Sequence, residues 1–200
     1  MSEPVVHVID DDPAMRDSLT FLLDTAGLQA TTYESAVDFL EAGEPSPGCI
    51  VTDVRMPDMN GLELVRRLKE REVTLPVIMI TGHGDVPLAV EAMKAGVLDF
   101  LEKPFDDDAL LAAIRSALAA NHDPAGQDEE RRRFHELLEQ LSPREKDVLR
   151  GVVAGKPNKV VAFELGISPR TVEVYRANVM TKTGAGSLSE LVRMALLAGF

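Results

Sequence analysis

Short apolar segments alternate with amphipathic stretches over the first 120 residues. The segments are rich in β-branched residues and bounded by turn residues, which is typical of buried strands. They are VVHVI from Val5, QATTY from Gln29, CIVT from Cys49, PVIMIT from Pro76 and DFLE from Asp99. Helical periodicity lies between them, for example over 13–26, 62–71 and 86–95. This alternation predicts an α/β domain with a doubly wound, five-stranded parallel sheet.

A wholly helical pattern follows after residue 141. Residues 121–127, NHDPAGQ, predict a break, because proline and glycine interrupt regular structure. The stretch from Asp128 predicts a short linker helix. Four further helical segments, each closing on a glycine, begin at Ser142, Asn158, Ser168 and Ser187. The predicted organisation is an α/β domain over 1–121, a partly helical linker over 122–140 and a small all-α four-helix domain over 141–200.

Charge divides the chain in the same way. The whole sequence has a net charge of −12, with 45% apolar and 27% charged residues, which is ordinary for a globular protein. Residues 1–120 contain 22 Asp and Glu against 9 Lys and Arg, a net charge of −13, whereas residues 141–200 contain 5 against 9, a net charge of +4. Only the C-terminal segment therefore carries a charge that attracts a phosphate backbone.

The sequence also narrows the expected compartment. A single cysteine, Cys49, allows no internal disulfide and no multi-cysteine metal site. The first residues lack a basic region followed by an apolar stretch, and no apolar run approaches the ~18 residues that cross a bilayer. We expect a cytoplasmic protein with no membrane partner.

Acidic residues end two of the predicted strands. Asp10, Asp11 and Asp12 follow the first strand, and Asp53 ends the third. The carboxyl ends of parallel strands share one edge of the sheet, so these carboxylates are expected to converge. Two unit charges ~4 Å apart repel by about 4 kcal/mol at an effective dielectric constant of about 20. Such a cluster therefore needs a hard cation such as Mg2+ or a protonated member.

Two further polar residues follow the same edge. Thr81 ends the fourth strand, and Lys103 follows the fifth. A hydroxyl and an ammonium beside a carboxylate nucleophile can hold a transferred phosphoryl group. Each residue alone has a simpler explanation, since a lone Asp at a strand end is usually a helix cap or a solvated turn. Their joint placement favours a phosphoryl-transfer site.

The motifs VIDDD, VTDVRMPDMNG, MITGHGD and LEKPF resemble the receiver domain family, whose fold is flavodoxin-like, over residues 1 to about 120. The resemblance implies that Asp53 accepts a phosphoryl group from a sensor histidine kinase. It also implies that Asp10 and Asp11 hold Mg2+ together with Asp53 and the backbone carbonyl of Arg55. Asp12 is left without a role. A protein of this kind is a switch rather than an enzyme.

The same resemblance assigns the residues that respond to the phosphoryl group. Thr81 and Lys103 are expected to contact its oxygens, and Phe100 matches the family's switch aromatic. Phe100 could equally be an ordinary core residue of a strand. His83, two residues after Thr81, would lie near the attacking water of hydrolysis.

The C-terminal segment contains a helix, a glycine turn at Gly166 and a second helix, as a DNA-binding helix-turn-helix requires. A plain helical hairpin would show the same pattern. Val172, Tyr175 and Val179 share the face of the second helix that should pack inward. The residues expected on or beside its outward face, toward base edges, are Arg170, Thr171, Glu173, Val174, Ala177, Asn178 and Thr181. Expected phosphate contacts are Lys156, Lys159, Arg176 and Lys182.

The string from LSPREKDVL to TKTGA resembles the LuxR/NarL-type output domain, from about residue 139 to the end. TGHGDVPLAVEAMKAG together with ISPRTVEVYRANVM and SELVRMAL is similar to the FixJ type of response regulator. This resemblance implies a phosphorylation-dependent homodimer that binds double-stranded promoter DNA and works with RNA polymerase. Its expected targets are nitrogen-fixation or microaerobic respiration genes. Relatives with similar strings serve aromatic-compound catabolism, which is the alternative.

Two other classes of function compete with this interpretation. One is a hydrolase that forms an aspartyl-phosphate, of the haloacid dehalogenase kind, but such enzymes require a second Asp two residues after the nucleophile, where this sequence has Arg55. The other is a signalling adaptor whose helical tail binds protein. Rising salt would weaken binding steeply only if the partner is DNA, so the salt dependence of binding distinguishes a DNA-binding regulator from such an adaptor.

Overall fold

The computed structural model describes residues 3–82, 86–120 and 124–200. Its contacts divide the chain into two compact units, one of residues 1–83 with 95–122 and one of residues 84–94 with 123–200. Helix α4 (Val86–Lys94) is therefore grouped with the second unit, although the sequence pattern placed it in the first domain.

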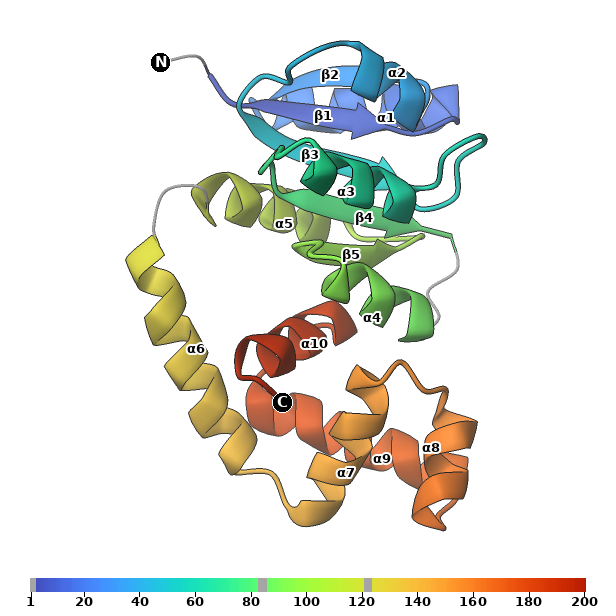
Figure 1. The fold of residues 1–200 in the computed structure, drawn as a ribbon, viewed down its shortest axis with the longest axis vertical. Coiled ribbons are helices and arrows are strands. Elements are labelled where there is room, and N and C mark those ends of the chain that lie inside the picture. The colour runs from blue at the N-terminus through green and yellow to red at the C-terminus, as the bar shows by residue number, and fades with distance from the viewer. Residues whose placement is uncertain (1–2, 83–85, 121–123) are drawn as a thin grey trace. The chain divides into compact units, whose positions relative to one another are not determined.

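A parallel sheet forms the centre of the first unit (Figure 1). Its strands are β1 (Val5–Ile9), β2 (Gln29–Tyr33), β3 (Gly48–Asp53), β4 (Val77–Thr81) and β5 (Asp99–Glu102). They pair in the order β2-β1-β3-β4-β5, and the neighbouring strands in this order run parallel to each other. The predicted doubly wound sheet is confirmed.

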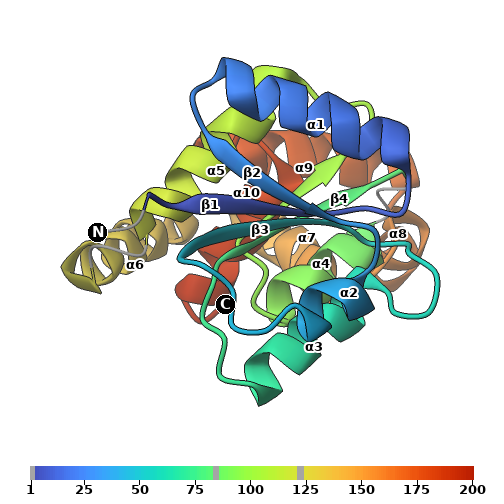
Figure 2. The same ribbon diagram turned by 90° about the horizontal axis from the view of Figure 1, so that it is seen from above.

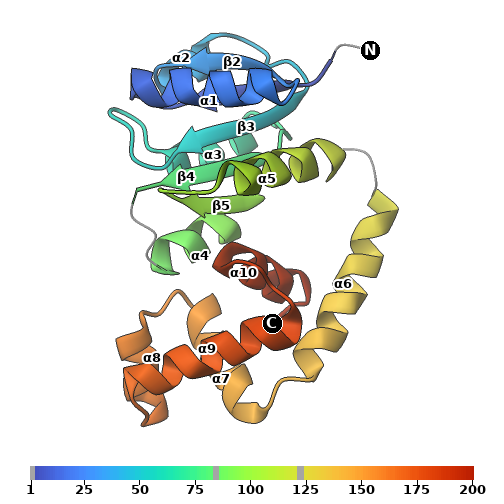
Figure 3. The same cartoon turned by 180° about the vertical axis from the view of Figure 1, so that it is seen from behind.

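Helices cover both faces of this sheet. α1 (Pro13–Thr25) and α5 (Asp107–Ala120) lie on one face, as Figure 3 shows from behind. α2 (Ala36–Glu41) and α3 (Gly61–Glu70) lie on the other face (Figure 2). The core under α1 and α5 joins side chains such as Leu23, Ile78 and Ile114, which are all at most 1% exposed. Each such side chain contributes about 1.5–3 kcal/mol by leaving water.

The start of α1 explains the acid that the sequence left without a role. Asp12 is the N-cap of α1, and its carboxylate accepts the backbone N–H of Ala14 at 2.9 Å. Pro13 follows at the first helical position, where its missing N–H has no consequence. This start directs the chain away from the end of β1 and leaves Asp10 at the sheet edge.

The second unit consists of α4 and five C-terminal helices. These are α6 (Pro124–Glu139), α7 (Pro143–Val153), α8 (Asn158–Leu165), α9 (Pro169–Thr183) and α10 (Leu188–Leu197). The four helices expected after residue 141 are confirmed. The break expected over 121–127 is wrong for its second half, because α6 already begins at Pro124. Proline suits the first turn of a helix, so Pro124 starts this helix instead of interrupting it.

Helix α6 is packed into the core of the second unit. Phe134 is 7% exposed and Leu138 is 2% exposed, and both lie in one cluster with Leu149 and Leu191. The guanidinium of Arg193 lies 5.7 Å from the centre of the Phe134 ring. The segment expected to be a linker therefore supplies part of the hydrophobic core of the second unit.

Candidate functional site

Three charged side chains meet at the carboxyl edge of the sheet. Asp10 follows β1, Asp53 ends β3 and Lys103 follows β5. The Nζ of Lys103 lies 2.6 Å from Oδ2 of Asp53 and 3.2 Å from Oδ2 of Asp10. One ammonium thus bridges two carboxylates that are 50 and 93 residues away from it in sequence. The predicted convergence of these residues is what the parallel topology produces.

Backbone donors fix the two carboxylates. Oδ1 of Asp53 accepts the backbone N–H of Arg55 at 2.9 Å. Oδ1 of Asp10 accepts the backbone N–H of Asp12 at 2.9 Å. The side chain of Asp53 keeps 13% of its surface exposed, against 4% for Asp10. Asp53 is therefore the more accessible carboxylate of the pair.

Burial and charge shift the pKa values of this cluster. Burial raises the pKa of Asp10, despite the opposing effects of the Asp12 N–H and of Lys103. Burial acts to lower the pKa of Lys103, but the hydrogen bond to Asp53 and the charges of both carboxylates outweigh it, so its pKa is raised. Lys103 is accordingly a fixed cation at neutral pH, available to balance negative charge.

The remaining residues predicted for this site lie in different surroundings. Thr81 is fully buried at the end of β4, and Phe100 on β5 is 8% exposed. Asp11 is exposed, and within residues 3–82, 86–120 and 124–200 no three His, Cys, Asp or Glu side chains form a group that could hold a metal. The carboxylates of Asp10, Asp11 and Asp53 are thus not assembled into one cluster. His83 lies outside the described residues.

A cavity lies beside Lys103. It has a volume of about 500 Å³ and is lined by Gly82, Lys103 and residues of α1 such as Met15 and Leu22. A Cβ added to Gly82 would meet no atom within 4 Å, so the chain after β4 leaves this side of the site open.

The second candidate site is the helix-turn-helix of α8 and α9. Gly166 ends α8 with a φ of 66°, a conformation that favours glycine, and Ser168 caps α9 by accepting the backbone N–H of Thr171. Val172 and Val179 are at most 1% exposed, and Tyr175 packs against the same cluster as Val172. The inward face is therefore the one that the sequence predicted.

The opposite face of α9 is open to solvent. Its exposed residues are Arg170, Glu173, Val174, Ala177, Asn178, Thr181 and Lys182, while Thr171 is half-buried. Val174 is 54% exposed, which is unusual for a large apolar side chain. A side chain of this kind suits contact with a thymine methyl group in a major groove.

The basic residues near this face differ in how they are paired. Nζ of Lys156 lies 2.7 Å from Glu164, and Nζ of Lys182 lies 2.8 Å from Glu145. The guanidinium of Arg176 donates to Oδ1 of Asn158 at 2.9 Å. These three residues were expected to bind phosphates, but each neutralises or orients a neighbour within the unit. Lys159 and Arg170 are exposed.

Glu145 is a structural residue that the sequence analysis did not single out. It closes a capping box with Ser142 at the start of α7, and it is 3% exposed. Its spacing from Ser142, S-x-x-E, is the signal that could have revealed it. The hydrogen bond from Lys182 and the backbone N–H of Ser142 lower its pKa.

This lowered pKa predicts an acid-sensitive term in the stability of the second unit. A depressed carboxyl pKa contributes stability above its unfolded value, near pH 4.5, and this contribution is lost as the pH falls through the lower, folded pKa. Glu145→Gln should therefore flatten the fall in unfolding free energy below about pH 4.5, measured by urea unfolding. The exposed Glu173→Gln serves as the control. Equal pH slopes for Glu145→Gln and the unmodified protein would contradict this role.

Two known families match the segments that contain the two candidate sites. Residues 6–115 match the response regulator receiver domain, and residues 139–195 match the luxR family of bacterial regulatory proteins. The receiver match contains the Asp10, Asp53 and Lys103 cluster, and the luxR match contains the helix-turn-helix. The two matches together define the class, a receiver joined to a DNA-binding domain.

Full-length relatives narrow the class further. The transcriptional regulatory protein FixJ of Azorhizobium caulinodans is 59% identical over 97% of this chain and 92% of its own length. FixJ of Rhizobium meliloti is 51% identical over 100% of this chain and 98% of its own. The crystal structure of full-length FixJ from B. japonicum has 53% identity and a TM-score of 0.59, covering 100% of this chain and 98% of that one. The chain belongs to the FixJ type of two-component response regulators, which are transcription regulators.

Proposed function

We propose that this chain is a phosphorylation-activated transcriptional activator in which Asp53 is the phosphoacceptor. The observation that supports it best is the bridge from Lys103 to Asp53 and Asp10 at the carboxyl edge of the sheet. Asp53 combines the greater exposure with two fixed contacts, to Lys103 and to the N–H of Arg55. These contacts hold a carboxylate oxygen in place for attack without a mobile general base.

The proposed reaction transfers a phosphoryl group from a histidine of a sensor kinase. A carboxylate oxygen of Asp53 forms the new P–O bond, the P–N bond breaks, and the imidazole nitrogen of the donor leaves with the electron pair. The product acyl phosphate brings about two negative charges to the site. Lys103, held beside Asp53, is the cation that balances them, and the hydroxyl of Thr81 is proposed to donate to a phosphoryl oxygen.

The residues present fit a Mg2+ ion. This ion usually keeps several waters and takes only one or two carboxylates from the protein, and Asp10 and Asp53 both reach the same ammonium. Burial raises the pKa of Asp10, so a nearby divalent cation would favour its charged form. We propose Asp10, Asp53 and the backbone carbonyl of Arg55 as its holders. Asp11, which is exposed and stands outside the Asp10–Asp53 pair, is proposed to join them after its side chain turns toward the ion. When bound, the ion would neutralise phosphoryl oxygens.

Activation of DNA binding is proposed to follow from movements of the Thr81 and Phe100 side chains. Both side chains are buried in the described structure, so movement of Thr81 toward a phosphoryl group would vacate space for the Phe100 ring. The resulting change in the receiver surface is proposed to promote a homodimer, which places two α9 helices on half-sites about 10 base pairs apart. RNA polymerase would then be recruited to the promoter.

Phosphorylation is therefore expected to raise both the molecular mass of the particle in solution and its affinity for DNA. Treatment with acetyl phosphate and Mg2+ should shift the protein toward twice its 21.8 kDa mass in light scattering. Binding to a selected DNA fragment should tighten by about 10²-fold or more, since a second tethered contact adds avidity. Asp53→Asn is the matched control, with neither change. A phosphorylated protein that binds tightly as a monomer would contradict the dimer mechanism.

The two faces of the helix-turn-helix predict separate DNA defects. Glu173→Ala should reduce the discrimination between bases at one position of the DNA site by about 1–3 kcal/mol of binding free energy, because it removes a base-edge contact. Lys159→Ala should weaken binding to all DNA sequences alike. It should also reduce the slope of log binding constant against log salt concentration by about 1. Lys156→Ala is the control, since its ammonium is already paired with Glu164 and should change the slope less. Equal weakening of all sequences by Glu173→Ala would show that the base-contacting face is misassigned.

The proposed targets are nitrogen-fixation or microaerobic respiration genes, because the relatives with the highest identities quoted above are named FixJ. Regulation of another pathway, such as aromatic catabolism, is the alternative, and selection of bound DNA by the phosphorylated protein would distinguish them. A regulator that binds promoters would act in the cytoplasm. No helix in the described part of the chain is long and apolar enough to cross a membrane.

A switch is favoured over a hydrolase by the residue two positions after Asp53. That position is occupied by the exposed cation Arg55, whereas an aspartyl-phosphate hydrolase of the haloacid dehalogenase kind needs a second Asp there. The luxR match over residues 139–195 further favours DNA, rather than another protein, as the partner that the C-terminal helices bind.

A further inference from the structure

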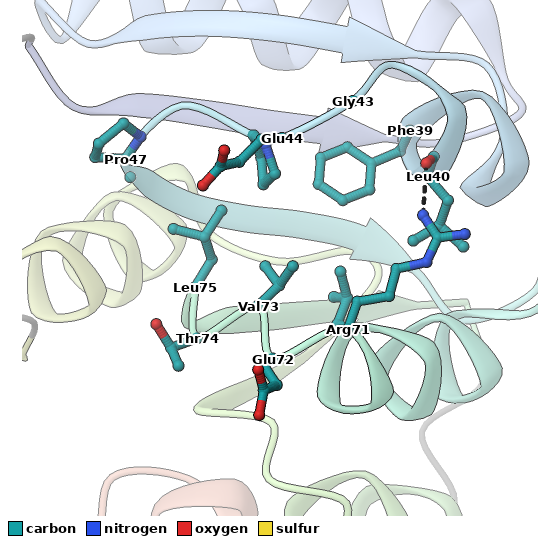
Figure 4. Close-up of a pocket in the computed structure, with 13 residues that line it drawn as sticks. Phe39, Leu40, Gly43, Glu44, Pro47, Arg71, Glu72, Val73, Thr74 and Leu75 are labelled. Carbon is teal, nitrogen blue, oxygen red and sulfur yellow. Dashed lines mark hydrogen bonds between the residues drawn. The ribbon is translucent and has the colours of Figure 1, made fainter.

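The receiver unit contains a second cavity at the sheet edge opposite Asp53. It has a volume of about 650 Å³, which is within the usual range for small-molecule sites. The loop between α2 and β3 and the loop between α3 and β4 form its walls, and Figure 4 shows the side chains that line it. Gly48 at the start of β3 lies in its wall, so the cavity is about 16 Å from Asp53 at ~3.3 Å per strand residue.

The floor of this cavity is apolar and its two sides carry opposite charges. Phe39, Val73 and Leu75 line the middle, as Figure 4 shows. Glu44 lies on one side of Phe39 and Arg71 on the other (Figure 4). One guanidinium nitrogen of Arg71 donates to the backbone carbonyl of Leu40 at 2.6 Å, which fixes this cation at the rim.

The geometry points to a binding site for a small amphipathic zwitterion. We propose that a ligand with an apolar body, an ammonium and a carboxylate occupies this cavity. Its apolar body would cover the half-buried side chains of Val73 and Leu75, its ammonium would pair with Glu44 and its carboxylate with Arg71. A guanidinium fits a carboxylate through two parallel hydrogen bonds. A ligand with a single charge would leave either Glu44 or Arg71 without an opposite charge on the ligand, so it should bind more weakly than a zwitterion.

The wall of the cavity is connected to the buried side of the sheet. The Phe39 ring contacts the rings of His7 and Tyr33 edge-on, with centroids 5.5 and 5.0 Å away. Nε2 of His7 lies 3.0 Å from the carbonyl oxygen of Ser46, in the loop that carries Glu44. His7 is 2% exposed and lies on β1, three residues before Asp10. The cavity wall is therefore held in shape before any ligand arrives.

Titration of the full-length protein with L-phenylalanine, followed by amide chemical shifts in 15N spectra, tests the proposal. Shifts should gather on residues 39–48 and 68–75, with a dissociation constant of about 1 mM for so small a ligand. Phenethylamine lacks the carboxylate and 3-phenylpropionate lacks the ammonium, so each should bind at least about tenfold more weakly. Equal binding of all three compounds would overturn the zwitterion assignment.

Three variants complete the test. Arg71→Gln and Glu44→Gln should each weaken binding of L-phenylalanine about tenfold or more. Glu70→Gln should change it less than about twofold, because Glu70 is an exposed acid at the end of α3 that does not line the cavity. Glu44 lies on an exposed loop, so its variant is expected to fold even if Arg71→Gln does not. Unchanged binding in Glu44→Gln, or no local shifts at 20-fold the expected constant of about 1 mM, would overturn the site.

Discussion

Acetyl phosphate with Mg2+ is expected to label this protein once, on Asp53, and Asp53→Asn is expected to lose the label completely. An amide nitrogen is not a phosphoryl acceptor, so the loss should be total rather than partial. The amide oxygen of Asn can still accept the Arg55 N–H that now binds Oδ1 of Asp53. The variant should therefore unfold at a denaturant concentration close to that of the unmodified protein.

A second carboxylate in the same cluster does not replace Asp53. Asp10 is 2% exposed, and burial raises its pKa, so it is both less accessible and less readily ionised. Asp58→Asn is the matched control, because Asp58 is an exposed acid in the next loop and its φ of 63° also suits Asn. Mass spectrometry should find one added phosphoryl group in this control. Full labelling of Asp53→Asn would contradict the assignment, and chelation of Mg2+ should abolish labelling of the unmodified protein.

The meeting of Asp10, Asp53 and Lys103 at one edge of the sheet could be predicted, because it follows from the strand topology. Once five strands are recognised as parallel, residues at the ends of β1, β3 and β5 must meet at one edge. The sequence could not predict that Lys103 would lie between Asp10 and Asp53, since this depends on side-chain conformation. It also left Asp12 without a role, because an N-cap and a ligand have the same residue type and spacing here.

Helix α9 shows which features of the candidate DNA-contacting face could not be predicted from the sequence pattern. Helical periodicity identified the inward and outward faces of α9 correctly, because burial follows a period of 3.6 residues. It could not identify which cations are already paired. Lys182 reaches Glu145 on α7, 37 residues away, and that contact exists only after α7 and α9 have packed together. A cation on an exposed face is thus a weaker indication of a phosphate contact than its position suggests.

The C-terminal unit is expected to need α6 in order to fold. A fragment of residues 127–200 should unfold cooperatively and bind DNA without phosphorylation, whereas a fragment of residues 141–200 should lack a cooperative transition. Both fragments lack α4, so they differ only in α6 and the residues that join it to α7. The shorter fragment loses Phe134 and Leu138, which are 7% and 2% exposed in the core with Leu149 and Leu191. Truncating buried side chains of these sizes costs about 2–5 kcal/mol each, which approaches the whole stability of about 5–15 kcal/mol for a typical domain.

Point variants separate packing from simple chain length in this prediction. In the full-length protein, Phe134→Ala should lower the unfolding free energy of the C-terminal unit by about 3–5 kcal/mol in a urea titration. Glu136→Ala, on the exposed side of the same helix, should change it by less than about 0.5 kcal/mol. If residues 141–200 alone were as stable as residues 127–200, the packing of α6 would not contribute to the core. If the longer fragment folded but failed to bind DNA, the receiver would be required for binding and could not act only as a brake on this unit.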